Sequence, residues 1–165
     1  MTGNEERRHE GVESQLVVFH VGSEEYGIPI SYVREIINQT RVVRLPKMPS
    51  FIIGVINLRG RVIPVIDLAD KFALPLDGSE QTSKKILIVE MDNTMVGYLV
   101  SAVSEVLTVS RESLEKPSYA LANLESNLVE YICSFDKRLF PVLDVLQMFS
   151  GDETGELADV MEQAN

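Results

Sequence analysis

The residues that could carry out acid–base or nucleophilic chemistry are few in this sequence, and they are scattered. His9 lies in a polar N-terminal arm, and His20 lies in an expected strand with no Asp, Ser or Cys beside it. The single cysteine, Cys133, lies in an apolar strand pattern, which is typical of a small buried hydrophobe in a reducing compartment. Because no general base stands next to a nucleophile, the sequence predicts a binding module and not an enzyme.

Motifs that hold metals, phosphates or acyl groups are also missing. The Cys and His residues do not have zinc-site spacing, and there is neither a phosphate-binding glycine loop nor a G-x-S-x-G nucleophile elbow. Asp67 and Asp70 form a carboxylate pair, but Asp67 stands where a short helix should begin, and helix capping accounts for it. We therefore expect no catalytic residue, no metal and no cofactor.

Length and composition indicate one globular domain. The chain has 165 residues, of which 45% are apolar, and this is enough for a core. No stretch is long and apolar enough to cross a bilayer, and the first residues lack the apolar segment of a signal peptide, so we expect a cytoplasmic protein with no direct membrane insertion. The net charge of −10 makes nucleic acid a poor partner.

One basic stretch departs from this acidic balance. Between positions 34 and 61 the only acid is Glu35, against the cations Arg34, Arg41, Arg44, Lys47, Arg59 and Arg61. This stretch is either a solvated face or a docking surface for an acidic protein or for RNA. A small barrel protein that binds RNA through residues 34–61 is therefore the alternative function.

The sequence contains an internal repeat. An offset of 77 residues brings Arg61, Pro64 and Asp67 onto Arg138, Pro141 and Asp144, within two stretches that also match in their apolar residues. An offset of 70 residues brings 16–37 onto 86–107, with the matches Gly27 and Gly97, Ser31 and Ser101, Val33 and Val103, Glu35 and Glu105. The matches keep the same order, so they indicate a duplication of about 16–72 and 86–149.

Short strands with turn residues between them predict the fold class. We expect an all-β protein with two SH3-like five-stranded β-barrel subdomains and short helices. The domain would span 15–150, with subdomains at roughly 15–80 and 81–150, between a disordered arm at 1–14 and an acidic tail at 151–165. The sequence leaves open whether the first strands of each half close their own barrel or the other one.

Several local elements can be assigned. Residues 52–58 and 62–66 read as a hairpin turning at Arg59 and Gly60, and 103–109 reads as a strand. Pro29 suggests an edge strand, and Pro64 suggests an edge strand or a bend, because proline cannot donate to a ladder. Residues 32–38 read as a short helix after Ser31, and 41–45 as a short strand. We expect a polar linker at 77–83.

Arg59 is the turn residue that differs most between the repeats, since Asp136 takes its place in the second copy. Turn residues are free to serve function, whereas strand residues mostly serve packing. Glu35 is the only acid in the basic stretch, so we expect Arg59 to bind it. The pair would either be a surface ion pair or orient segment 32–38 beside a groove between the barrels.

These stretches resemble a known family. Residues 54–60, GVINLRG, with 63–68, IPVIDL, are similar to the signature of the CheW family of chemotaxis coupling proteins. Residues 25–28 with 33–36, and 96–97 with 103–107, resemble its first and middle parts. The resemblance covers about 15–150. Ser101 stands where the family often has Asp, and the acidic tail lies outside the match.

The resemblance implies two SH3-like barrels and a function without catalysis. It implies an adaptor that links the tip of methyl-accepting chemotaxis receptors to the regulatory domain of the CheA histidine kinase. Carried onto this chain, the kinase would bind near Val33 and Gly54. The receptor helix would lie in a groove between the barrels, at Ile30, Glu35, Ile36, Arg59, Val103 and Val106.

Overall fold

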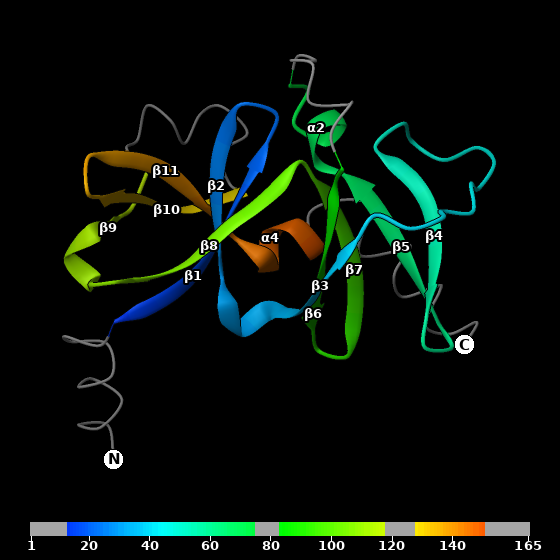
Figure 1. Ribbon diagram of the computed structural model, residues 1–165, viewed down its shortest axis with the longest axis horizontal. Helices are drawn as coiled ribbons and strands as arrows, with labels where there is room; N and C mark the ends of the chain where they lie inside the picture. The colour runs from blue at the N-terminus through cyan, green and yellow to red at the C-terminus, as the bar shows by residue number, and fades with distance from the viewer. Residues whose placement is uncertain (1–12, 75–82, 118–127, 151–165) are drawn as a thin grey trace.

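The computed structural model of the chain describes residues 13–74, 83–117 and 128–150. Almost all of the expected N-terminal arm and linker, and the whole acidic tail, lie outside these residues. Figure 1 shows a six-stranded sheet on the left and a five-stranded sheet on the right, with the helix α4 between them.

The six-stranded sheet has the order β8-β1-β2-β11-β10-β9. Its strands are β1 (Ser14–Val21), β2 (Glu24–Pro29), β8 (Ala102–Val109), β9 (Leu114–Glu115), β10 (Val129–Phe135) and β11 (Arg138–Leu143). The five-stranded sheet has the order β3-β6-β7-β5-β4. Its strands are β3 (Val33–Asn38), β4 (Ile52–Leu58), β5 (Arg61–Asp67), β6 (Lys85–Met91) and β7 (Thr94–Val100).

Short helices connect or follow the strands. The 3-10 helix η1 (Ile30–Tyr32) precedes β3, and η3 (Arg111–Ser113) precedes β9. The α-helix α2 (Leu68–Lys71) follows β5, and α4 (Val145–Ser150) follows β11. Each α-helix therefore comes directly after the second strand of a hairpin, as the repeat in the sequence requires.

The two repeats exchange their first hairpins. The β1–β2 hairpin joins the strands of the second repeat through a parallel pairing of β2 with β11, and the β6–β7 hairpin joins those of the first through β7 and β5. The parallel contacts fall at matched positions, Val142 with Gly27 and Val65 with Gly97. The first strands of each half thus complete the other half's barrel, which is the question the sequence left open.

The hairpin-to-helix corners are also matched. The N–H of Asp67 donates to the carbonyl of Phe51, and the N–H of Asp144 donates to the carbonyl of Leu128, both at 2.7 Å. The Asp67 carboxylate accepts from the N–H of Ala69 at 3.0 Å and caps α2, as predicted. Asp144 caps α4 in the same way.

One continuous core fills the space between the sheets. Its largest cluster takes buried side chains from both sheets and from α2 and α4, including Phe19, Leu68, Val89, Tyr98 and Phe149. Two smaller clusters fill the barrels themselves. The smaller cluster of the six-stranded sheet includes Cys133, whose buried position confirms the prediction, and burial raises the pKa of its thiol.

The expected helix at 32–38 is wrong, because residues 33–38 form the edge strand β3. This strand pairs antiparallel with β6, where Ile37 lies opposite Ile86. Its β-branched residues suit a strand, and its side chains alternate: Val33 and Ile37 are half-buried, whereas Ile36 is exposed. The expected strand at 41–45 is reduced to a bridge between Val43 and Val55.

Neither proline lies in an edge strand, contrary to the prediction for Pro29 and to one of the two alternatives for Pro64. Pro64 lies in β5, between β4 and β7. It is tolerated there because the parallel pairing with β7 begins only at Val65, so no ladder bond needs its missing N–H. Pro29 is likewise the last residue of β2, beyond the contact with β11 at Gly27. The predicted strand at 103–109 is confirmed as β8.

We predict that Asp144→Ala lowers the free energy of unfolding by about 1 kcal/mol, because α4 loses its side-chain cap. The Asp144 carboxylate accepts from the N–H of Gln147 at 3.1 Å. Urea unfolding followed by circular dichroism measures the loss. Asp144→Asn keeps an acceptor and should be close to wild type, so an equal loss in both variants would contradict the capping role.

Candidate functional site

Five of the eight candidate partner-binding residues lie on two edge strands, β3 and β8. Each strand ends the order of its sheet, so one of its backbone edges has no neighbour among the described strands. Ile36 on β3 is 42% exposed and Val106 on β8 is 49% exposed. These two residues occupy matched positions of the repeat, and Ile30 at the entry to β3 is exposed as well.

A β-bulge precedes the glutamate of each edge strand. In β3 the register with β6 shifts between Val33 and Glu35, and in β8 the register with β1 shifts between Val103 and Glu105. The extra residue in β8 is Ser104, whose hydroxyl donates to the carbonyl of Val18 at 3.1 Å. Bulges redirect side chains and often lie beside functional sites. Both edge strands therefore present a glutamate and an exposed apolar residue in the same order.

Arg59 binds Glu35, as the sequence predicts. The β4–β5 turn places both Arg59 and Gly60 at positive φ, as a two-residue hairpin requires. The Arg59 guanidinium forms a two-pronged ion pair with the Glu35 carboxylate, with one contact at 3.1 Å. The hydrogen bond from Arg59 lowers the pKa of Glu35, and Glu35 raises the pKa of Arg59 in return.

The ion pair joins the β4–β5 turn to the strand β3 on the protein surface. The Arg59 side chain is 73% exposed, and an exposed pair of this kind adds little to stability. Since 32–38 is not a helix, the element that Arg59 can orient is the edge strand β3.

Three of the predicted contact residues are less accessible. Val33 and Val103 are half-buried and pack against the core between the sheets. Gly54 is buried under the segment that follows β3: a Cβ there would lie 2.0 Å from the carbonyl oxygen of Val43. Two backbone hydrogen bonds of 2.8 Å between Val43 and Val55 fix this segment on β4. Gly54 therefore supports the segment above it and does not itself present a contact surface.

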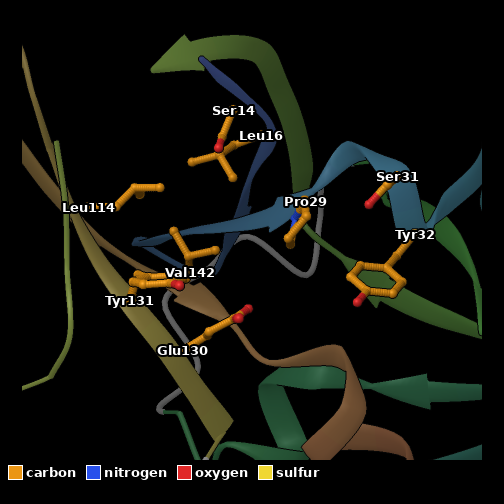
Figure 2. Close-up of a pocket in the computed structure, with 9 residues that line it drawn as sticks. All are labelled: Ser14, Leu16, Pro29, Ser31, Tyr32, Leu114, Glu130, Tyr131 and Val142. Carbon is orange, nitrogen blue, oxygen red and sulfur yellow. The ribbon is translucent and has the colours of Figure 1, made fainter. Parts of the chain in front are cut away.

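The space between the barrels is filled by a packed core. A hollow of about 230 Å³ opens instead on the six-stranded sheet, next to η1 (Figure 2). Its lining is Ser14, Leu16, Pro29, Ser31, Tyr32, Leu114, Glu130, Tyr131 and Val142. Burial, and then the nearby Asp144, raise the pKa of Glu130. None of the predicted contact residues lines this hollow.

A second ionic cluster was not predicted. Arg138, at the start of β11, donates to the carboxylate of Glu25 at 2.8 and 3.3 Å and to that of Glu105 at 2.5 Å. The internal repeat contained a clue to this cluster, because Glu105 matches Glu35 and Arg138 matches Arg61. The pairing was missed because the arginine that reaches the glutamate comes from a different position in each repeat.

No group of His, Cys, Asp and Glu side chains in the described residues could hold a metal ion. Within the same ranges, no helix has the length and hydropathy needed to span a bilayer.

A family model described as a CheW-like domain matches residues 15–153. The chain belongs to the CheW family. It is 35% identical to the probable chemotaxis protein CheW of Rhizobium etli over 141 residues, which are 85% of this chain and 90% of that protein. It is 31% identical to the chemotaxis protein CheW of Rhizobium meliloti over 140 residues, covering 84% and 89% of the two chains.

A solved structure agrees with this assignment. The scaffolding protein TtCheW from Thermoanaerobacter tengcongensis is similar with a TM-score of 0.76 and 33% identity, over 84% of this chain and 93% of that one. The all-β fold with two SH3-like subdomains is thereby confirmed. As a CheW-family protein, the chain is a chemotaxis coupling scaffold, and the comparisons give no support to RNA binding.

We predict that Arg59→Gln raises the pKa of Glu35 toward its ordinary value of 4.5. The arginine favours the charged carboxylate, so its contribution to stability is present above that value and is lost as the pH falls through the lowered pKa. A carboxyl-carbon NMR titration measures this. Arg34→Gln is the matched control and should shift the pKa less, because Arg34 acts on Glu35 only through its charge. An unchanged titration in Arg59→Gln would contradict the assignment.

We predict that Gly54→Ala lowers the free energy of unfolding by about 1–3 kcal/mol, because the new methyl group meets the fixed backbone of Val43. Gly97→Ala is the comparison, since its methyl group would meet a side-chain carbon of Ile86 at 2.8 Å. A side chain can move more readily than a bonded backbone, so this loss should be smaller. Urea unfolding of both variants measures the two losses of unfolding free energy. Equal losses would argue against a rigid segment over Gly54.

Proposed function

We propose that this chain is the adaptor that couples the cytoplasmic tips of methyl-accepting chemotaxis receptors to the CheA histidine kinase. The observation that carries this proposal is the pair of matched apolar residues, Ile36 and Val106, exposed on the two edge strands. Exposed apolar side chains gain little hydrophobic stabilisation while they face water, whereas a partner that covers them gains apolar contact area.

The receptor-binding residues of the proposal are Ile30, Glu35, Ile36, Arg59, Val103 and Val106. A receptor helix would lie on the surface of the seam, with its apolar residues on Ile36 and Val106. Glu35 and Arg59 would fix the position of β3 and offer charged groups at the rim. Val103 would contribute indirectly, because it packs on the core and supports β8.

The kinase-binding region of the proposal is the part of the first barrel around Val33 and Gly54. Gly54 is covered by the segment at Val43, which is itself 58% exposed. The regulatory domain of the kinase would therefore contact this segment. Gly54 would allow the segment to pack closely on β4, because it has no side chain. Exposed cations in this segment, including Arg41 and Arg44, suit an acidic partner surface.

The proposed activity requires no catalytic group. The chain would act in the cytoplasm as a binding protein and not as an enzyme. It would bind neither nucleic acid nor the membrane directly, since its net charge of −10 disfavours polyanions.

A reconstitution of the purified chain with receptor cytoplasmic fragments and the kinase tests the proposal. The chain should sediment with the receptor fragments and raise the rate of kinase autophosphorylation. Ile36→Ser should weaken sedimentation about tenfold, because a central apolar contact is lost. The matched control is Leu139→Ser, which removes an apolar residue that is 72% exposed on β11. A chain that neither sediments with the receptor nor alters the kinase would refute the proposal.

A further inference from the structure

Each edge strand is held by an arginine that binds the glutamate following its bulge. On β3, Glu35 is bound by Arg59. On β8, Glu105 is bound by Arg138 at 2.5 Å. Among the described strands, β3 and β8 each have a neighbour on one side only, so these ion pairs attach them at a second point besides the ladder.

The two barrels differ in which arginines bind the exchanged hairpin and the edge strand. In the first barrel, Arg61 donates to the backbone carbonyl of Asn93, in the turn of the exchanged hairpin, at 3.0 Å, and a separate residue, Arg59, binds the edge strand. In the second barrel, Arg138 matches Arg61 and does both tasks. It binds Glu25 of the exchanged hairpin and also Glu105 of the edge strand.

The surroundings of Arg138 favour a fixed geometry. Its side chain is 33% exposed, against 73% for Arg59. Its guanidinium carbon lies 5.7 Å from the centre of the Phe140 ring. The bonds to Glu25 and Glu105 raise its pKa, so it stays charged. The planar guanidinium of an arginine loses less rotamer entropy per hydrogen bond than a flexible lysine side chain does. Contacts with two carboxylates and an aromatic ring hold it in one orientation.

We infer that Arg138 is a positioning residue for partner binding: through Glu105 it fixes the bulged edge strand β8 and thereby the exposed Val106. This inference rests on the proposed function, in which Val106 contacts the receptor. Arg138 links β11 to β8 across the two strands between them, β2 and β1. It does for the second barrel what Arg59 does for the first.

The test uses Glu105→Gln in the full chain, which removes the attachment of β8 but keeps Arg138 bound to Glu25. The affinity for a receptor cytoplasmic fragment should fall about three- to tenfold, while affinity for the kinase regulatory domain stays within twofold of wild type. Amide hydrogen exchange of the free variant should be faster in β8 than in wild type, because the strand has lost its second attachment.

Two further variants separate positioning from other roles. Glu25→Gln removes the bond to the exchanged hairpin, so it should lower the melting temperature and leave receptor affinity near wild type. Arg138→Gln should weaken receptor binding as Glu105→Gln does, and the double variant should be no weaker, because both changes remove one interaction. Lys137→Gln removes an exposed cation from the adjacent turn and is the matched control.

The outcomes are distinct. Wild-type binding to the receptor fragment with an unchanged affinity in Glu105→Gln would overturn the inference and leave the proposed function standing. A loss in Glu105→Gln but not in Arg138→Gln would also overturn it, since Glu105 would then touch the receptor directly. Failure of the wild-type chain to bind the receptor fragment would instead refute the proposed function.

Discussion

Burial of one apolar cluster between the two sheets is the interaction on which the rest of this structure depends. Within the described part of the chain, sixteen buried side chains from both sheets and from α2 and α4 form it. A fully buried Val, Leu, Ile or Phe contributes about 1.5–3 kcal/mol. Val33 and Val103 rest against this cluster, so the strands that carry the exposed Ile36 and Val106 keep a fixed position relative to the core. The surface that we propose for the partner is thus carried by strands that pack on the core.

Local chemistry made much of the fold predictable from the sequence. Short-range patterns predict the hairpin at Arg59 and Gly60, the cap at Asp67 and the strand β8, and the structure confirms all three. The internal repeat is read from matches between the two halves of the sequence, and the structure confirms it as well. The segment 33–38 was mistaken for a helix because a serine cap and apolar spacing fit both interpretations. Pairing with β6, which is distant in sequence, decides in favour of a strand.

In the candidate site, an ion pair could be predicted where one repeat differs from the other. An ion pair could not be predicted where its two residues come from strands that are distant in sequence. Arg59 stood out because the second repeat has Asp136 at that position, and Glu35 was the only acid within reach. Arg138 gave no such signal, since it matches Arg61 and its partners Glu25 and Glu105 lie on strands that only the exchanged topology brings together. Burial of Gly54 likewise depends on the segment at Val43, which no pattern places on β4.

The exchange of hairpins also bears on how the molecule is made. The strand β2 needs β11 as a neighbour, and β11 is among the last described strands of the chain. A nascent chain leaving the ribosome therefore carries the β1–β2 hairpin without this neighbour until β11 has been made. Contacts between residues so far apart in sequence close slowly. During this interval the hairpin has an uncovered apolar face and an unpaired edge of β2, and such features favour aggregation and chaperone binding.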